Sequence, residues 1–250
     1  MKVFVILALV AAAVAVPVEE NPDRFMYNEG MLGGDIKGGY QLVKNAEGKT
    51  TVIPDSWYIY WPNSVIYYEI DSSLNNERGA IQEAMEEYHR NTCLRFEERN
   101  GNTNIRNYIY IRGDLSGCWS YMGMYTQGYQ EVSLQRNGCV YKGTIMHELM
   151  HAAGFWHEHQ RFDRDDYVRI RFENVISGYE SNFDIADLSQ SVNVGGASYD
   201  FDSVMHYELT AFSSNGQRTI EPYGGQDPGF VWDQNYFSAG DINQLNAVYC

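Results

Sequence analysis

The feature that most constrains this chain is the eleven-residue run His-Glu-Leu-Met-His-Ala-Ala-Gly-Phe-Trp-His, which begins at His147. His147 and His151 are four positions apart, so in a helix they lie on one face, as two ligands of a tetrahedral metal ion must. Gly154 can adopt a positive φ and end the helix, which allows His157 to turn back toward the first two imidazoles. The run therefore predicts a helix over 143–151, a turn at Gly154 and a three-histidine metal site.

Glu148 adds a catalytic group to this site. It follows the first histidine directly, so its carboxylate can reach a metal-activated water without itself being a ligand, as metal-assisted peptide hydrolysis requires. The pattern H-E-x-x-H-x-x-G-x-x-H is typical of zinc peptidases. A helix with incidental histidines would need five matched positions to coincide. A purely structural zinc site would need a fourth Cys or His ligand, and an inactive binding protein would usually have lost a ligand or the base.

The other histidines lack such a pattern. His89, His159 and His206 are expected at the surface or in the core, with His159 a candidate contact behind the ligands. The segment Ser-Val-Met-His-Tyr at 203–207 supplies the methionine expected beneath the zinc in enzymes with the extended motif, so Met205 is predicted to pack there and not to bind the metal.

The amino-terminal segment has the form of a signal peptide. Lys2 precedes an apolar run over 3–16, and the small residues Ala13 and Ala15 suit signal peptidase. A membrane anchor needs about 20 apolar residues, and this run is shorter. We therefore expect a signal peptide at 1–15 and a secreted, extracellular protein without a membrane partner.

Four cysteines, Cys93, Cys118, Cys139 and Cys250, occur in this chain. In an oxidising compartment an even set normally forms disulfides, so two bridges are expected. Three pairings are possible, and the spacing does not choose among them. Zinc ligation by these cysteines is the alternative, but they are too scattered to form the usual C-x-x-C pairs.

Composition excludes two classes of partner. The formal net charge is −15, whereas nucleic-acid and anionic-membrane binding need a basic surface. With 250 residues, 44% of them hydrophobic, the chain can bury the core of one domain or of two tightly packed lobes. We expect a monomer.

Periodic patterns predict the upper part of the fold. The glycine-rich stretch at 18–44 reads as an extended segment, and 157–250 holds short patterned stretches suited to a largely irregular lobe. The strongest patterns predict strands at 64–70, 108–112 and 131–134 and a helix at 77–91.

Over 45–250 the chain resembles the astacin family of metzincins. The resemblance implies an α+β fold of the zincin type, with two lobes: a twisted sheet and helices above, and a largely irregular lobe below. It also implies one zinc ion and cleavage of internal peptide bonds in an extended protein or peptide substrate, held along the strand at 118–121. The matching blocks lie at 117–121, 137–140, 143–151, 154–159 and 203–207.

The resemblance also assigns individual residues. Tyr207 matches the tyrosine that binds zinc at rest and then stabilises the tetrahedral intermediate, which makes it catalytic together with Glu148. Glu158 matches the carboxylate that meets the new amino terminus of the mature enzyme. The implied disulfides join Cys93 to Cys250 and Cys118 to Cys139.

The segment at 16–44 resembles the inhibitory propeptide of the same family, in which an aspartate takes the place of the catalytic water on zinc. That residue is Asp35 here, within Leu-Gly-Gly-Asp, where Leu32 replaces the usual phenylalanine. A plain Gly-Gly-Asp turn is the alternative. Lys44 suits an activating protease of trypsin type, which would leave the metalloprotease domain at 45–250.

Overall fold

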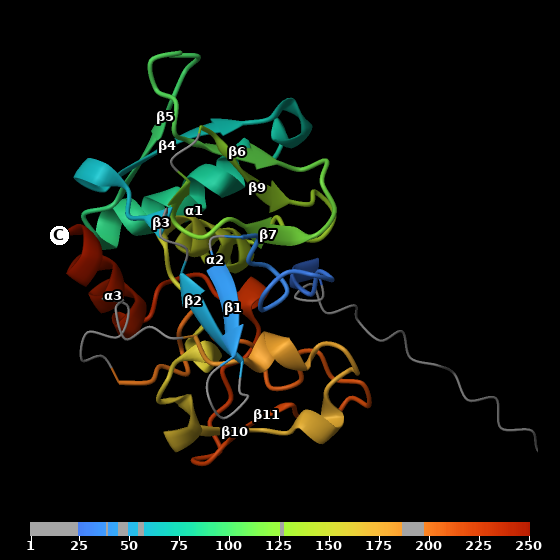
Figure 1. Ribbon diagram of the computed structural model, residues 1–250. Helices are drawn as coiled ribbons and strands as arrows, with labels where there is room; N and C mark the ends of the chain where they lie inside the picture. The colour runs from blue at the N-terminus through green and yellow to red at the C-terminus, as the bar shows by residue number, and fades with distance from the viewer. Residues whose placement is uncertain (1–24, 39, 45–49, 55–57, 126–127, 187–197) are drawn as a thin grey trace, which may run out of the picture.

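The chain folds into two lobes with an α+β architecture, as expected (Figure 1). The upper lobe contains the main sheet with helices α1 and α2, and the lower lobe contains β10 and β11. The predicted signal peptide at 1–15 and the predicted first residues of the mature chain, 45–46, lie outside the described residues. The computed structural model describes residues 25–38, 40–44, 50–54, 58–125, 128–186 and 198–250.

A five-stranded sheet in the order β5-β4-β6-β9-β7 forms the upper lobe. The first four strands are parallel, and β7 runs antiparallel to β9 at the edge. An edge strand leaves one row of backbone groups available to an added chain. The strands are β4 (Val65–Ile70), β5 (Arg95–Glu98), β6 (Ile109–Arg112), β7 (Cys118–Ser120) and β9 (Gln130–Leu134).

The predicted strands are confirmed to within one residue as β4, β6 and β9. Side chains alternate along β6, where Ile109 and Ile111 are fully buried and Tyr110 and Arg112 lie on the opposite, partly exposed face. This alternation follows from the two-residue period of a strand. The sheet therefore has one face against the helices and one face toward solvent.

Helices α1 (Arg78–Asn91) and α2 (Lys142–Ala153) pack together and confirm both predicted helices. Residues of α2 from Gly143 onward are buried, since the helix lies between the sheet and the lower lobe. It ends at Gly154, whose φ of 106° is accessible at little cost to glycine alone.

The remaining elements are short, apart from α3 (Ala239–Tyr249), which was not predicted. Three two-stranded pairs join β1 (Tyr40–Lys44) to β2 (Thr50–Pro54), β3 (Tyr58–Ile59) to β8 (Met124–Tyr125), and β10 (Val168–Ile170) to β11 (Ile220–Pro222). Short 3-10 turns lie at Pro62–Ser64, Ser72–Leu74, Glu158–Gln160, Arg164–Asp166, Phe172–Asn174, Glu180–Phe183 and Val231–Asp233.

Two disulfides join Cys93 to Cys250 and Cys118 to Cys139. This is the pairing that the family resemblance implied, and it excludes the other two. The first bridge spans 157 residues of sequence and ties the end of α3 to the loop between α1 and β5. The second ties β7 to the segment before α2.

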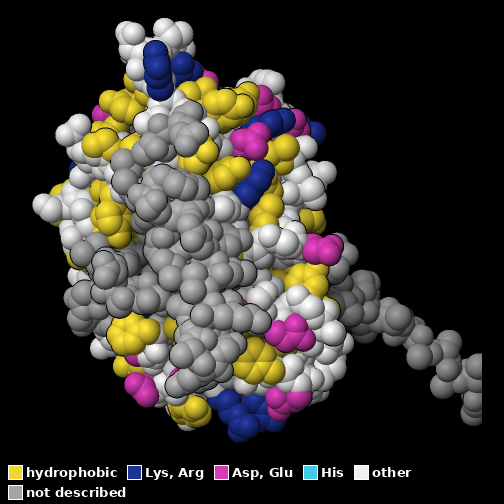
Figure 2. Space-filling view, in the orientation of Figure 1, with side chains coloured by type: hydrophobic (Ala, Val, Ile, Leu, Met, Phe, Trp, Pro, Cys, Tyr) yellow, Lys and Arg dark blue, Asp and Glu magenta, His cyan; other side chains and the backbone are white. Residues whose placement is uncertain are grey.

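Over the part of the chain that is described, no helix combines the length and the apolar character needed to cross a membrane. On the face shown in Figure 2, the described Lys and Arg side chains are interspersed with Asp and Glu.

Candidate metal centre

Three imidazoles and one carboxylate converge between the lobes. His147 and His151 project from the same face of α2, and the turn at Gly154 returns the chain so that His157 joins them. Asp35, from the predicted propeptide, completes the group. One ligand atom from each of the four side chains lies within 4.8 Å of all the others, and all four side chains are fully buried. The predicted three-histidine cluster is thus assembled, together with the predicted aspartate.

The second nitrogen of each imidazole has an acceptor. Nδ1 of His147 lies 2.6 Å from the carbonyl oxygen of Val204, and Nδ1 of His151 lies 2.7 Å from that of Phe155. A carbonyl oxygen only accepts, so each of these Nδ1 atoms carries the hydrogen and donates. The Nε2 atoms of both rings therefore present lone pairs to the centre of the cluster.

The spacing of these atoms fits zinc. Nε2 of His157 lies 3.1 Å from Nε2 of His151 and 3.3 Å from that of His147, while Oδ2 of Asp35 lies 3.1 Å from Nε2 of His147. Tetrahedral ligands about 2.0–2.1 Å from a metal are separated by about 3.3–3.4 Å. Lone pairs and a buried anion at such distances repel one another unless a cation lies between them. The donor set, three nitrogens and one oxygen, suits one zinc ion.

Burial and nearby charge shift the pKa values of the side chains in this cluster. Burial lowers the pKa of His151 to about 3, which keeps the imidazole neutral, the form that binds metal. Burial alone would raise the pKa of Asp35, but positive charge in the cluster, chiefly from His157, holds it well below its ordinary value. The carboxylate of Asp35 is therefore ionised, as a ligand must be.

Backbone contacts hold Asp35 in place along the edge of the sheet. The amide of Ser120 in β7 donates to the carbonyl oxygen of Asp35 at 2.9 Å, and the amide of Lys37 donates to that of Ser120 at 2.8 Å. Ile36 forms a parallel bridge with Ser120. The predicted propeptide thus occupies the free edge of β7.

Apolar side chains flank the aspartate on both sides. Leu32 is 4% exposed and Ile36 fully buried, and they share a small cluster with Met122, Trp156 and Ala186. The leucine that replaces the usual phenylalanine is therefore packed within this apolar cluster. The departure from the usual pattern does not remove an apolar contact at this position.

Tyr207 also reaches the centre. Its hydroxyl donates to Oδ2 of Asp35 at 2.7 Å and contacts the carbonyl oxygen of Gly33. The side chain is almost completely buried, and burial raises the pKa of the phenol well above its ordinary value, so it remains a donor. Met205 is buried in the hydrophobic core, as expected of a packing residue.

Glu148 lies buried beside the histidines. Burial, together with the nearby carboxylate of Asp35, raises its pKa well above the ordinary value. Among the described residues, neither of its carboxylate oxygens has a hydrogen-bond partner. A buried carboxyl group without hydrogen-bond partners destabilises the fold. Groups of this kind, with a raised pKa, are typical of functional sites, where a general base must accept a proton.

The remaining histidines are not among the four clustered side chains. The ring of His159 stacks on that of His157 with centroids 5.2 Å apart, which agrees with a contact behind the ligands. His206 is buried with Nε2 2.7 Å from the hydroxyl of Tyr199, and His89 lies on the partly exposed side of α1.

Glu158 is buried beneath the centre. Its Oε1 accepts from the backbone amide of Asp200 at 2.8 Å and from Nη1 of Arg161 at 3.1 Å. Burial raises its pKa to about 7, although Arg161 opposes the shift. The predicted contact with a new amino terminus therefore concerns a carboxylate that already has partners in the uncleaved chain.

Sequence reasoning missed two supporting residues. Gln160 accepts from Nδ1 of His157 through Oε1 at 2.9 Å. Asp241, in the first turn of α3, accepts a hydrogen bond from the hydroxyl of Ser203 at 2.6 Å and another from the amide of Val204 at 3.1 Å. The carbonyl oxygen of Val204 in turn accepts the hydrogen bond from Nδ1 of His147. Gln160 could have been found from its position three residues after a ligand, whereas Asp241 lies far away in sequence.

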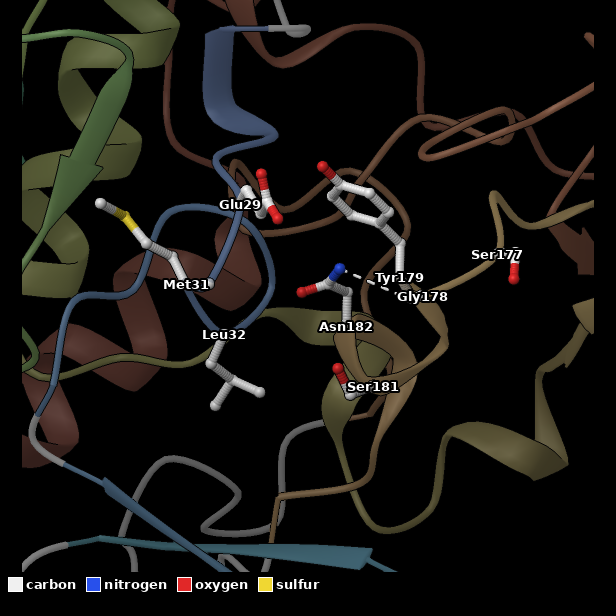
Figure 3. A pocket seen from close by; sticks show the side chains of 9 residues that line it. Glu29, Met31, Leu32, Ser177, Gly178, Tyr179, Ser181 and Asn182 are labelled. Atoms are coloured by element: carbon white, nitrogen blue, oxygen red, sulfur yellow. Dashed lines mark hydrogen bonds between the residues drawn. The ribbon is translucent and has the colours of Figure 1, made fainter.

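A pocket of about 330 Å³ lies beside the loop at 29–32 of the predicted propeptide (Figure 3). Glu29, Met31 and Leu32 contribute one side, and Tyr179 and Asn182 of the lower lobe contribute the other. The amide of Asn182 donates to the carbonyl oxygen of Tyr179 at 3.0 Å, which fixes the lower wall. One wall therefore belongs to the segment that also carries Asp35.

Several known proteins are similar to this chain over most of its length. The family model "Astacin (Peptidase family M12A)" matches residues 55–250. Zinc metalloproteinase nas-6 of Caenorhabditis elegans is 40% identical over 226 residues, which are 89% of this chain and 63% of that protein. Meprin A subunit beta of Homo sapiens is 39% identical over 230 residues, 91% of this chain and 31% of that protein.

A solved structure is also similar to this chain in fold and sequence. High choriolytic enzyme 1, a hatching enzyme zinc-protease from Oryzias latipes, matches with a TM-score of 0.66 and 38% identity over 77% of this chain and 94% of its own. The chain spans less than two thirds of the length of the two curated relatives named above. The extended histidine motif, its assembled geometry and the match over 55–250 together place the chain in the astacin family, peptidase family M12A.

Proposed function

We propose that this chain is a zinc-dependent endopeptidase made as a secreted, latent precursor. The observation that carries the proposal is the cluster of His147, His151 and His157 closed by Asp35, a residue of the predicted propeptide. Three protein ligands with one exchangeable position define a catalytic zinc site. Asp35 would occupy that position in the precursor and leave it on activation.

Bound zinc would supply Lewis-acid chemistry by polarising the scissile carbonyl and lowering the pKa of a water molecule toward 7. Glu148 would accept the proton from that water and pass it to the leaving amine. Its buried position next to His147, with no competing donor among the described residues, supports this role.

Tyr207 would stabilise the oxyanion of the tetrahedral intermediate. In the uncleaved chain, Oδ2 of Asp35 would occupy the place that an anionic oxygen of the intermediate takes during the reaction. The hydroxyl of Tyr207 donates to that atom at 2.7 Å, within the distance that stabilises an oxyanion. Removal of Asp35 would free the same donor for substrate.

Protein or peptide substrates would bind as an extended strand along β7. Ser120 already bonds to the propeptide backbone through both its amide and its carbonyl, which supports strand addition at this edge. Backbone pairing of this kind accepts many sequences, so broad endopeptidase action is expected.

Activation would occur by cleavage after Lys44, by a protease of trypsin type. The proposed organisation is a signal peptide at 1–15, an inhibitory propeptide at 16–44 and a protease domain at 45–250. Lys44 ends β1 and pairs with Thr50 of β2, so the cleavage would separate the two strands of one hairpin. The new amino terminus could then move to Glu158. We propose a monomer without a membrane or nucleic-acid partner.

The test is the substitution Glu148→Gln in the activated protein. Zinc content should stay near that of the parent, because the three histidines remain, while hydrolysis of a fluorogenic peptide should cease because the base is removed. Atomic absorption and initial rates measure the two quantities. Turnover close to that of the parent would contradict the proposed role, and so would loss of zinc.

A further inference from the structure

His157 differs from the other two clustered histidines in what holds it. His147 and His151 project from α2, and each donates from Nδ1 to a backbone carbonyl oxygen. His157 lies outside any helix, in extended backbone with φ −65° and ψ 146°, directly before the 3-10 turn Glu158–Gln160. Its Nδ1 lies 2.9 Å from a side-chain oxygen, Oε1 of Gln160. Of the three imidazoles, the one without helical support is also the one whose partner a substitution can change.

The 3-10 turn brings Gln160 back to His157. The amide of Gln160 donates to the carbonyl oxygen of His157 at 3.1 Å, so the turn and the side-chain contact join the same two residues. Side chains three positions apart eclipse one another in a 3-10 turn. The carbonyl oxygen of Gln160 accepts from the amide of Ala186 at 2.8 Å. Both backbone groups of Gln160 are therefore bonded, and its side chain can be exchanged without loss of these bonds.

Packing restricts the ring of His157 but does not decide where its hydrogen lies. The ring contacts those of Tyr207 and His159, with centroids 4.4 and 5.2 Å away. A neutral imidazole carries its hydrogen on one nitrogen, and the hydrogen-bond partners of the ring decide which one. Oε1 of Gln160 only accepts, so it keeps the hydrogen on Nδ1 and leaves the lone pair of Nε2 for the metal.

The direction of the Gln160 amide group points to the same role. The side chain is fully buried, and its Nε2 has no hydrogen-bond partner among the described residues. An amide rotated by half a turn would direct its NH₂ group at Nδ1 of His157, and the ring hydrogen would then lie on Nε2, where it would block metal binding. Hydrogen bonding within the described residues would permit either direction, whereas metal binding permits only the one found.

We propose that Gln160 is a positioning residue: its side-chain oxygen holds His157 in the tautomer and orientation that bind zinc, and so determines how firmly the site retains the metal. The inference rests on the proposed function, in which three histidines hold a catalytic zinc. It adds to the site a residue that lies outside the extended histidine motif. Loss of a partner of this kind typically lowers metal affinity by about 10-fold to 100-fold.

Three substitutions at this position separate the proposed role from a general effect on folding. Gln160→Met keeps an unbranched side chain of similar length, but its thioether is only a weak acceptor. Gln160→Asn keeps the amide and withdraws it from the ring by one methylene group. Gln160→Glu keeps an acceptor at the original distance. Gln217→Met, at an exposed glutamine of the lower lobe, is the control.

The stability of the metal-free fold should rank these variants differently from zinc affinity. Gln160→Glu adds a buried carboxyl group, which destabilises the fold, whereas Gln160→Met removes the unpartnered Nε2. Metal-free Gln160→Glu should therefore melt below metal-free Gln160→Met. Zinc affinity should follow the opposite order, because a carboxylate accepts from Nδ1 at least as well as an amide oxygen does and a thioether does not.

The experiment uses uncleaved full chains. Competition with a fluorescent chelator measures their zinc dissociation constants, and melting temperatures are measured after the metal is removed. Gln160→Met and Gln160→Asn should bind zinc about 10-fold to 100-fold more weakly than the parent. Gln160→Glu should bind it at least as tightly as the parent, and Gln217→Met should match the parent. Equal affinities of the parent, Gln160→Met and Gln160→Asn would overturn the proposal, and so would weaker zinc binding by Gln160→Glu than by Gln160→Met.

Peptide hydrolysis by the parent, cleaved after Lys44 and loaded with zinc, tests the proposed function separately. Weakened zinc binding by Gln160→Met and Gln160→Asn, together with an inactive parent, would refute the peptidase and leave the role of Gln160 standing. An active parent whose zinc affinity is unchanged by both substitutions would refute the role of Gln160 and leave the peptidase standing.

Discussion

A methyl group added at Gly33 should weaken latency without altering the activated enzyme. Gly33 has a φ of 62°, and a Cβ built on it would lie 2.5 Å from Nδ1 of His157. Ordinary contacts between heavy atoms are about 3.5–4.0 Å. The His157 ring is fully buried and held by Gln160, so it has little room to retreat.

Gly30 provides a matched control in the same segment. Its φ is 78°, and a Cβ there would have no atom within 4 Å. Alanine at either position pays the cost of a left-handed backbone, but Gly33→Ala alone adds the steric conflict. Overpacking of this kind costs about 1–3 kcal/mol, which corresponds to a rise of about fivefold to 150-fold in the open form of the precursor.

The assay is hydrolysis of a fluorogenic peptide by uncleaved, zinc-loaded precursors, with mass spectrometry to verify that the propeptide remains attached. Gly33→Ala should be faster than Gly30→Ala by about that factor. After cleavage after Lys44, both variants should match the parent, because the altered residue has left. Equal rates for the two uncleaved variants would show that close packing against His157 does not maintain latency.

Three further outcomes follow from the same geometry. Tyr207→Phe should retain zinc and lower kcat by about two to three orders of magnitude, since one oxyanion donor is lost, and an unchanged kcat would exclude that role. His157→Ala should release the metal on dialysis against a weak chelator, and zinc retained at parental affinity would remove His157 from the ligand set. Burial raises the pKa of Asp241 to about 6, above about 3.9 in an unfolded chain. The folded state then binds more protons between these values, so the contribution of Asp241 to stability is greatest below about pH 4 and falls as pH rises to about 6. The melting-temperature advantage of the parent over Asp241→Asn should therefore shrink across this range, and a constant difference would contradict the assigned pKa.

The helix that carries His147 and His151 could be predicted because the residues that determine it lie close together in the sequence. The four-residue spacing of His147 and His151 and the glycine that ends α2 act within one turn of helix. The strands β4, β6 and β9 could be predicted for a similar reason, since each has a continuous β-rich run. Disulfide pairing could not be predicted from spacing, because Cys93 and Cys250 meet across 157 residues, and only the family resemblance selected it.

Other features depend on contacts that a single sequence does not display. Three of the four residues of strand β5 are charged and Phe96 is its one apolar residue, so the sequence shows no strand pattern there, and α3 was missed within a region expected to be irregular. Asp241 supports the site through Ser203 and Val204, which are distant in sequence. The contacts of Lys37 with Trp119 and Glu131 require the register of β7 against β9, which only the assembled sheet provides.

The most direct measurement of the account compares peptide hydrolysis by two uncleaved, zinc-loaded precursors, the parent and Asp35→Ala, with amino-terminal sequencing to verify that both remain uncleaved. The account predicts that both hold one zinc through the three histidines, that the parent is almost inactive and that Asp35→Ala hydrolyses the peptide, because its metal has an open position. Equal and negligible rates, with zinc present in both, would contradict the assignment of Asp35 as the group that closes the site.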